Sequence, residues 1–271
     1  MVVLTGATRG IGQAAAIELA KRGADLALVG RDSTRVDEVV DKARAAGQAG
    51  IAVSGQVADL AEMDEVRRLA AELETAYPRI DVLANNAGAK FDSKHTTTDG
   101  FEQTFALNHL APFLLTNLLI DRLTEANARV VTTSSDAHHR AELDLEDLMF
   151  EDTRFRAWRA YGNSKLCNIL FTRELQKRHP ELTVNCFHPG VIRTGFGKND
   201  GTLSRISMAI VGPFFGSPAA GAKPLVHLAL DPVEGKGLYF NKLEPAFPSA
   251  QGQDDVLAAA LWERSAELTG L

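Results

Sequence analysis

The sequence predicts an α/β domain built on a parallel β-sheet, and three observations support this fold class. Short apolar runs alternate with longer amphipathic stretches along the 271 residues, which is the pattern of βαβ units. A glycine-rich turn, Thr5–Gly12, follows the first apolar run and opens a helical stretch. No internal repeat, low-complexity tract or linker divides the chain. We therefore expect a single doubly wound, Rossmann-like domain over residues 1–271.

About seven apolar runs are predicted as parallel strands because each is short and rich in aliphatic or aromatic residues. They are Val2–Thr5, Leu26–Gly30, Ile51–Ser54, Val82–Asn85, Val130–Thr133, Thr183–His188 and Leu238–Phe240. The segments between them have apolar residues at helical spacing, as expected of helices that flank a sheet. The predicted helices are Ile11–Arg22, Arg35–Ala46, Ala61–Ala76, Phe101–Leu123, Tyr161–Arg178, Ala219–Leu230 and Asp254–Leu268.

Two segments interrupt this alternation. Asp136–Ala160 is long and charged, and Thr194–Pro218 is rich in Gly, Ser and Phe. Long irregular segments in compact domains are usually functional. We predict that residues 136–160 form an insertion and that residues 194–218 form a substrate lid. Phe91 and the phenylalanines of the second segment suggest an apolar pocket, although they could equally belong to the core.

Composition excludes several classes of protein. A formal net charge of −6 provides no basic surface for nucleic acid or anionic membrane. No run approaches the roughly 20 apolar residues of a membrane span, and the first residues form a strand, so we expect a cytoplasmic protein with no membrane anchor. Cys167 and Cys186 lack CxxC spacing and are expected to be reduced, buried thiols. His138 and His139 have no third ligand at metal spacing, so no metal site is predicted.

Tyr161 and Lys165 are four residues apart, which places a phenol and an ammonium on one helix face, about 5–6 Å apart at Cβ. A positive charge there can lower the phenol's pKa from its usual value of about 10. Such a tyrosine would donate and accept protons near neutral pH. Combined with a dinucleotide-binding turn, the pair predicts hydride transfer coupled to proton transfer.

The turn Thr5–Gly12 contains Gly6, Gly10 and Gly12, a GxxxGxG pattern rather than the commoner GxGxxG. Glycines at this position let backbone N–H groups and a helix N-terminus approach a diphosphate. The second strand ends in Gly30-Arg31-Asp32. Arg31 fits the 2′-phosphate of NADP, and Arg9 could approach the same group from the turn. The alternative is that Arg31 is simply solvated and Asp32 accepts from the ribose of NAD.

Polar residues follow three further strands. Asn85-Asn86-Ala87-Gly88 could let a cofactor approach the sheet edge, or could be an ordinary turn. Asp59 could accept from the adenine amino group, cap the helix that begins near Ala61, or do both. Ser134-Ser135 ends the fifth strand, where a hydroxyl would lie across the carboxyl edge from the Tyr161 helix, although a serine pair after a strand is usually a turn.

In order and spacing these motifs resemble those of the short-chain dehydrogenase/reductase family. The matching residues are Thr5–Gly12, Asn85–Gly88, Asn108, Ser135, Tyr161, Lys165 and Pro189–Thr194. Finer features resemble the family's retinol dehydrogenase-like branch, namely Leu107–His109, Ser134–His138, Lys165–Asn168, His188–Gly190 and Leu261–Glu263. The interval between Ser135 and Tyr161 is about twice the family's usual one, and this branch has a similar insertion.

The resemblance implies a role for each catalytic residue. Tyr161 would be the general acid or base, and Lys165 would lower its pKa and bond the nicotinamide ribose. Ser135 would hold and polarise the substrate carbonyl, and Asn108 would position a water in a proton relay. Ser134 is not expected to substitute for Ser135, since adjacent strand-end residues point to opposite faces.

The resemblance also implies the cofactor contacts. The diphosphate and phosphate contacts match Gly6, Thr8, Arg9 and Ile11, together with Gly10 and Gly12 of the turn and with Arg31, while the adenine site matches Asp59 and Leu60. The ribose and nicotinamide contacts match Asn86, Ala87, Gly88, Tyr161, Lys165, Pro189, Ile192 and Thr194.

The sequence thus predicts an NADP(H)-dependent oxidoreductase that interconverts a carbonyl and an alcohol on a small, hydrophobic substrate, with NAD(H) as the less favoured cofactor. Two alternatives remain open. One is reduction of a C=C bond, because Tyr161 and Lys165 serve both reactions. The other is a non-catalytic NADP(H)-sensing protein, although a sensor needs no proton relay.

Members of the resembled family commonly pair through the helices that here would be Phe101–Leu123 and Tyr161–Arg178. The insertion carries apolar residues, Leu143, Leu145, Leu148, Met149, Phe150, Phe155 and Trp158, among many carboxylates. It could cover those helices with its apolar side inward and its carboxylates in water, so a monomer is favoured over a homodimer or homotetramer. In the competing interpretation the insertion lines the substrate pocket and leaves the pairing surface free.

Overall fold

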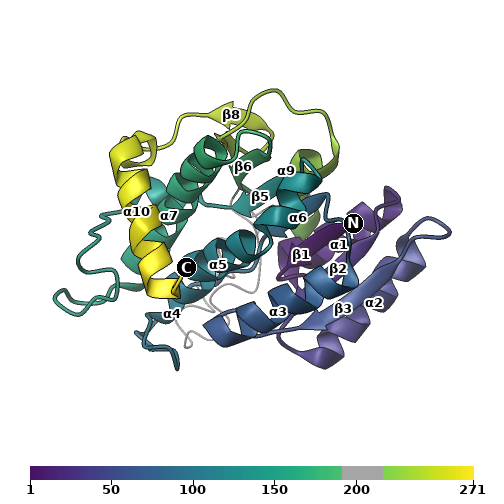
Figure 1. Cartoon of the computed structure of the whole chain (residues 1–271), viewed down its shortest axis with the longest axis horizontal. Helices are drawn as coiled ribbons and strands as arrows, with labels where there is room; N and C mark the ends of the chain where they lie inside the picture. Colours follow the sequence, from purple (N-terminus) through teal and green to yellow (C-terminus); the bar gives the residue numbers. More distant parts are fainter. Residues whose placement is uncertain (191–215) are drawn as a thin grey trace.

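One β-sheet of eight strands runs through the protein, in the order β3-β2-β1-β4-β5-β6-β7-β8 (Figure 1). The computed structural model describes residues 1–190 and 216–271. The first seven strands are parallel, and β8 is antiparallel to β7. Their bounds are β1 Val2–Thr5, β2 Leu26–Gly30, β3 Val53–Val57, β4 Val82–Asn85, β5 Arg129–Thr133, β6 Thr183–His188, β7 Leu238–Asn241 and β8 Glu244–Ala246. The predicted fold class is therefore confirmed.

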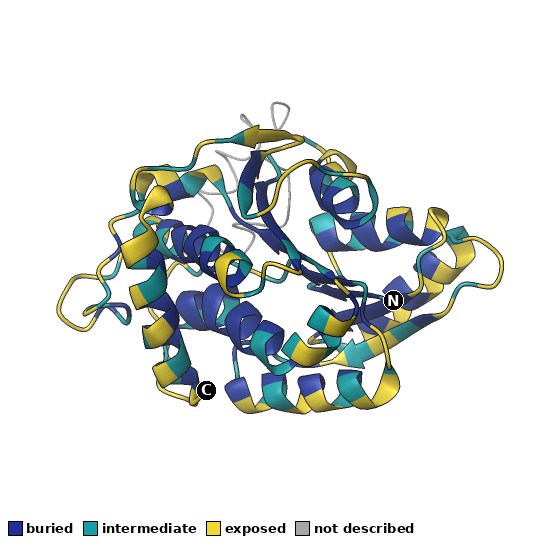
Figure 2. Ribbon diagram, turned by 45° about the horizontal axis from the view of Figure 1, so that its top comes forward, coloured by how far each residue is buried: buried dark blue, intermediate teal, exposed yellow. Residues whose placement is uncertain are grey.

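Helices cover both faces of the sheet. On one face lie α1 (Gly10–Lys21), α2 (Ser33–Ala46) and α9 (Pro218–Leu230). On the other lie α3 (Met63–Ala76), α5 (Ala111–Leu118) and α7 (Ala157–Arg178), with α10 (Asp255–Thr269) packed against α7. Figure 2 shows the consequence, since the central strands are buried while the outer helix faces are exposed. A parallel sheet covered on both faces explains why central strands such as β1 and β2 are continuous apolar runs.

The strand order produces a crevice at the carboxyl edge of the sheet. The chain winds outward from β1 to β3 and then crosses back to β4, on the other side of β1. At such a switch point the loops after the two central strands diverge and leave a crevice at the carboxyl edge of the sheet. The segments after β1, β4, β5 and β6 all reach this edge.

The predicted helix Phe101–Leu123 is divided into four pieces. They are α4 (Gln103–Phe105), a π-helical turn η1 (Ala106–Leu110), α5 and α6 (Ile120–Glu125). Pro112 has no N–H and cannot donate to the carbonyl of Asn108 four residues earlier. Instead, the N–H of Ala111 bonds the carbonyl of Ala106, which widens the turn. Asn108 lies inside this wide turn.

Other elements also differ from those predicted. β3 begins at Val53 rather than Ile51, because the N–H of Ala52 is bonded to the Asp25 side chain (2.7 Å). α7 begins at Ala157, so Tyr161 lies one turn inside the helix rather than at its start. β8 was not predicted, since Glu244–Ala246 is too short and polar to read as a strand.

The insertion is partly buried. After a short 3-10 helix η2 (Asp136–Arg140), Leu143, Leu148 and Phe150 are buried, and most of its carboxylates face solvent. Asn163 of α7 anchors this segment by bonding both the N–H and the carbonyl of Glu142 (2.9 and 3.1 Å). Leu145, Met149 and Phe155 are half-buried, and Trp158 has 65% of its surface exposed.

The outer surface of α5 and α7 is covered by α10, not only by the insertion as predicted. The yellow α10 runs beside α7 in Figure 1. Trp262 of α10 stacks on Phe171 of α7 (centroids 5.9 Å) and meets Phe113 of α5 edge-on (4.9 Å). Two ion pairs on the same helix faces, Arg173–Asp255 and Arg178–Glu263, flank this aromatic contact.

The predicted lid 194–218 lies outside the described residues, except for residues 216–218. Within residues 1–190 and 216–271, no helix is both long enough and apolar enough to cross a membrane.

His109, in the π-turn, is fully buried among Phe105, Phe113 and Phe171, and its Nε2 pairs with the Ser265 hydroxyl of α10 (2.8 Å). Burial disfavours the charged imidazolium and lowers the pKa of His109 to about 3.

This depressed pKa makes stability depend on pH. In the unfolded chain His109 takes up a proton below about pH 6.5, whereas in the folded chain it does so only near pH 3. The folded state therefore loses stability as pH falls from 6.5 toward 3. We expect the wild type to lose about 2 kcal/mol more unfolding free energy between pH 7 and pH 5 than His109→Gln, as measured by urea denaturation. Equal losses in the two proteins would contradict a neutral, buried His109.

Candidate active site

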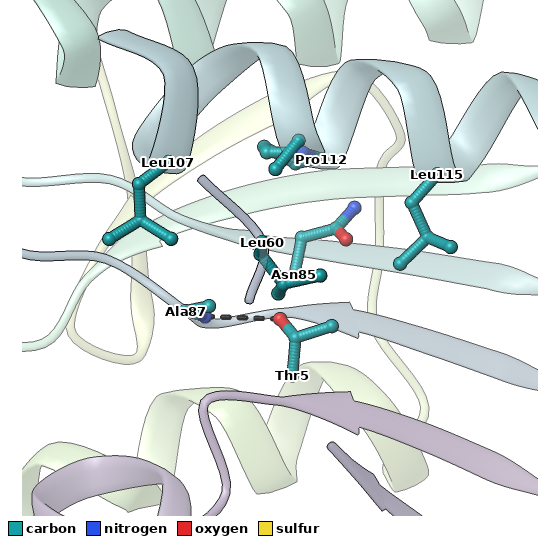
Figure 3. Close-up of a pocket in the computed structure, with 8 residues that line it drawn as sticks. Thr5, Leu60, Asn85, Ala87, Leu107, Pro112 and Leu115 are labelled. Carbon is teal, nitrogen blue, oxygen red and sulfur yellow. Dashed lines mark hydrogen bonds between the residues drawn. The ribbon is translucent and has the colours of Figure 1, made fainter. Parts of the chain in front are cut away.

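The turns after β1 and β4 are joined by hydrogen bonds at the carboxyl edge. The Thr5 hydroxyl accepts from the N–H groups of Asn86 and Ala87, both at 3.0 Å, and Figure 3 shows the bond to Ala87. The Asn86 amide in turn donates to the Thr5 carbonyl (2.9 Å). A Cβ on Gly6 would lie 2.7 Å from the Cα of Ala87, so glycine is required for this approach. These contacts give the predicted Asn86–Gly88 segment a fixed place beside the glycine turn.

A small cavity lies behind this junction, between the sheet and the helical segment that includes η1 and α5 (Figure 3). Thr5 and Asn85 line it on the sheet side, and Leu107 and Leu115 on the helical side. Its volume of about 10 Å³ is comparable to a single water molecule and far below that of a substrate. This cavity is therefore too small to hold a substrate.

The N-terminus of α1 has the properties of an anion site. Its N-cap residue, Arg9, makes no side-chain capping bond, and the first turn contains no acidic residue. Gly10 has a positive φ of 53°, which turns the chain into the helix. A Cβ on Gly12 would lie 2.1 Å from the carbonyl oxygen of Gly6, so only glycine fits where the turn folds back on the helix. The uncapped N–H groups and this close turn fit a bound diphosphate.

Thr8 packs against the end of β2, where a Cβ on Gly30 would meet its methyl group at 2.4 Å. Arg31 and Arg9 are both exposed near this contact. Asp32 is the N-cap of α2, and its carboxylate accepts from the N–H of Arg35 (3.1 Å). That capping bond gives Asp32 a structural role that requires no ribose.

Asp59 forms the turn after β3. Its carboxylate accepts from the N–H of Ala61 at 3.0 Å, but Asp59 does not cap the helix as predicted, because the N-cap of α3 is Glu62. The helix itself begins later than expected, at Met63, whose N–H bonds the Asp99 carboxylate (2.8 Å). Leu60 is buried beside Asp59.

Ser134 and Ser135 face different neighbours, as the alternation of a strand end predicts. The Ser134 hydroxyl is buried and donates to the Lys165 carbonyl of α7 (2.8 Å). Ser135 caps η2 by accepting from the N–H of Ala137 (3.2 Å), and its side chain is hydrogen-bonded to Tyr161. The structure therefore brings Ser135, and not Ser134, to the tyrosine.

Two residues without a predicted catalytic or cofactor-binding role position Ser135. A Cβ on Gly162 would lie 2.9 Å from the carbonyl oxygen of Ala137, so this glycine lets η2 pack directly on α7. His138 is buried, and its Nε2 accepts from the N–H of Ser249 (3.1 Å). Its Nδ1 must then carry the proton and donate to the Ser135 carbonyl (2.7 Å). A glycine inside a catalytic helix motif was the available signal.

Lys165 is the centre of the buried polar group. Its ammonium is bonded to the carbonyl of Thr133 (3.0 Å) and lies 5.6 Å from the centroid of the Tyr161 ring. Gly88 is next to it, since a Cβ there would be 3.2 Å from Nζ and 3.0 Å from Asn108 Oδ1. Asn108 binds both the N–H and the carbonyl of Ala89, each at 2.9 Å. Ser135, Tyr161, Lys165 and Asn108 thus meet at one place.

The pKa of Tyr161 differs from the sequence expectation. Burial raises it to about 12, and the hydrogen bond with Ser135 only partly opposes this effect. Burial also lowers the pKa of Lys165 to about 8, because the low-polarity surroundings disfavour its charge. In this structure the phenol therefore holds its proton firmly, and the expectation that Lys165 lowers its pKa is not met.

Several remaining predicted residues can be placed briefly. Pro189 follows β6 at the same edge, whereas Ile192 and Thr194 lie outside the described residues. Cys167 and Cys186 are buried and unpaired, as predicted. Among the described residues, no cluster of His, Cys, Asp or Glu is suited to a metal ion.

Comparisons with known proteins identify the family. The short chain dehydrogenase family matches residues 1–202. The Streptomyces protein named "Putative daunorubicin C-13 ketoreductase DnrU" (strain C5) is 44% identical over 272 residues, covering 99% of this chain and 92% of that protein. Retinol dehydrogenase 13 from Homo sapiens is 38% identical over 281 residues, covering 100% of this chain and 84% of that protein.

Solved structures agree. An uncharacterized protein from Mycobacterium paratuberculosis has a TM-score of 0.81 and 34% identity, covering 99% of this chain and 92% of its own. A short chain dehydrogenase from Burkholderia cenocepacia in complex with NADP has a TM-score of 0.70 and 25% identity. The match covers 89% of this chain and 94% of that one. This chain is therefore an oxidoreductase of the short-chain dehydrogenase family, in its retinol dehydrogenase-like branch.

Proposed function

We propose that this chain is an NADP(H)-dependent oxidoreductase that interconverts a carbonyl and an alcohol on a small, hydrophobic substrate. The observation that carries the proposal is the hydrogen bond between Tyr161 and Ser135 beside the buried ammonium of Lys165. Two relatives support it by name, one as a ketoreductase and one as a retinol dehydrogenase. Both names describe carbonyl and alcohol chemistry.

The residues of the carboxyl edge would hold the cofactor. The uncapped start of α1 would bind the diphosphate through backbone N–H groups of the glycine turn. Asp59 and Leu60 would border the adenine, while Asn86–Gly88, Pro189 and Lys165 would border the ribose and nicotinamide. When bound, the nicotinamide supplies or accepts the hydride.

The protein's own residues would handle the proton. Ser135 would hold the substrate carbonyl oxygen next to the Tyr161 hydroxyl. Because the pKa of Tyr161 is about 12, the phenol carries its proton at neutral pH and can donate it to the oxygen during reduction. The ammonium of Lys165 would stabilise the phenolate that remains. Asn108, bonded to Ala89 and Ser164, would keep this buried edge rigid and position a water for proton return.

The charged residues around the end of β2 favour NADP(H) over NAD(H) as the cofactor. Arg31 and Arg9 are exposed at the place where a 2′-phosphate would lie, and Asp32 is engaged in capping α2. The Burkholderia cenocepacia structure, which contains NADP, lends support from a relative. Both arginines would pair with the phosphate through charge-assisted hydrogen bonds.

Tyr161→Phe should lower kcat by about 10²–10⁴-fold in NADPH-dependent ketone reduction, because the proton donor is removed. NADPH binding, followed by fluorescence titration, should stay within a few fold. Tyr77→Phe is the matched control, since the Tyr77 hydroxyl pairs with Ser54, away from the catalytic residues. Retention of more than about a tenth of wild-type kcat in Tyr161→Phe would exclude it as the donor. Assaying an enone beside the ketone separates C=O from C=C reduction.

Arg31→Ala should raise the KM for NADPH about ten- to a hundredfold and leave the KM for NADH nearly unchanged, since a hydrogen bond to a charged group is lost. Lys42→Ala, an exposed cation farther along α2 that pairs with Glu38, controls for general loss of charge. Steady-state kinetics with both cofactors measures the effect. Equal wild-type efficiency with NADPH and NADH would count against the assignment.

We also propose that the protein is a monomer. The helices through which family members commonly pair correspond here to α5 and α7, and α10 covers both through Trp262. Light scattering at micromolar concentration should give the single-chain mass of 29.2 kDa. A mass two or four times larger would show that the protein pairs despite this helix.

A further inference from the structure

Trp158 is a large apolar side chain in an unusual position. The other apolar residues of the insertion are buried or half-buried, yet Trp158 has 65% of its surface exposed. It lies on α7 three residues before Tyr161, so both side chains project from the same face of the helix. Single exposed apolar residues are common and need no explanation by themselves. The neighbours of Trp158 make this one different.

Two contacts fix the orientation of the indole. The Lys90 ammonium lies 5.3 Å from the ring centroid, within the range of a cation–π interaction. The side chain of Lys90 is only 7% exposed and is held by an ion pair with Asp92. On another side, the Tyr161 ring meets the indole edge-on, with centroids 6.1 Å apart and planes at 83°. The exposed ring is therefore held in place rather than free to rotate in solvent.

The indole lies close to the proposed reaction site. Lys90 follows Asn86–Gly88, the segment that is bonded to the glycine turn and lies next to Lys165. Trp158 thus stands between that segment and the helix turn that carries Tyr161. Because the two rings meet edge-on, a substrate bound at Tyr161 would lie close to this exposed, oriented aromatic ring.

We propose that Trp158 is a stacking platform that makes the enzyme prefer planar aromatic carbonyl compounds over saturated ones. This proposal rests on the carbonyl reduction proposed above. A flat aromatic ring can lie against the indole in an offset or edge-to-face arrangement, whereas a puckered saturated ring can make only part of that contact. Because Lys90 and Tyr161 hold the indole already oriented, little side-chain entropy is lost when a substrate stacks on it.

The kinetic test uses acetophenone and cyclohexyl methyl ketone, which have the same carbon skeleton and differ in the planarity of the ring. The measured quantity is the ratio of kcat/KM for acetophenone to that for cyclohexyl methyl ketone. Trp158→Leu should lower this ratio about tenfold, chiefly through the KM for acetophenone, and tenfold corresponds to 1.4 kcal/mol. Trp158→Phe, which keeps a flat ring, should retain most of the preference. An unchanged ratio in Trp158→Leu would overturn the proposal.

Fluorescence provides a test that needs no turnover. The chain contains two tryptophans, and Trp262 is only 8% exposed, so Trp158 dominates collisions with a ligand. Acetophenone, added with NADP⁺ present, should quench the wild type in a saturable manner, and Trp158→Phe should lose the saturable part. Linear quenching in the wild type would overturn the platform even if both ketones are reduced. Saturable quenching without reduction of either ketone would support the platform and reject the proposed reaction instead.

Discussion

A buried cation is the constraint on which the arrangement of this protein's carboxyl edge depends. Lys165 is 2% exposed and lies among four segments: the end of β5, the turn after β4, the π-turn and its own helix. A charged ammonium in such surroundings needs polar partners, and burial already lowers its pKa to about 8. The Thr133 carbonyl provides one, and the missing side chain of Gly88 leaves the approach from β4 open. The glycine turn, the wide turn at Asn108 and the packing of η2 on α7 surround this one group.

The parallel sheet could be predicted from the sequence because most of its first seven strands contain a short apolar run and alternate with helical stretches. What the sequence did not show were features that depend on partners far along the chain. β8 is a short, polar strand that exists only because β7 offers it an edge. The division of the helix near Pro112 depends on a single absent N–H, which a helical apolar pattern does not reveal.

The positions of the site residues were more predictable than their electrostatics. Motif spacing correctly brought Ser135 to Tyr161 and directed Ser134 away from it. Spacing along a helix also suggested a lowered phenol pKa, but spacing does not report how deeply the group is buried, and desolvation dominates here. The sequence was also a poor guide to what covers the outer surface of α5 and α7. Apolar residues in the insertion suggested a cover, whereas Trp262, far along the chain, fits between Phe113 and Phe171.

The imidazole of His138 links the turn at Ser135 to the C-terminal segment at Ser249. One nitrogen holds the carbonyl of Ser135, and the other holds the N–H of Ser249, just before the segment that leads into α10. The last two dozen or so residues therefore both shield the outer helices and brace the serine turn from behind. In evolution the two properties would be inherited together. A descendant that shortened its C-terminus would uncover the outer surface of α5 and α7 and loosen Ser135 in one genetic event.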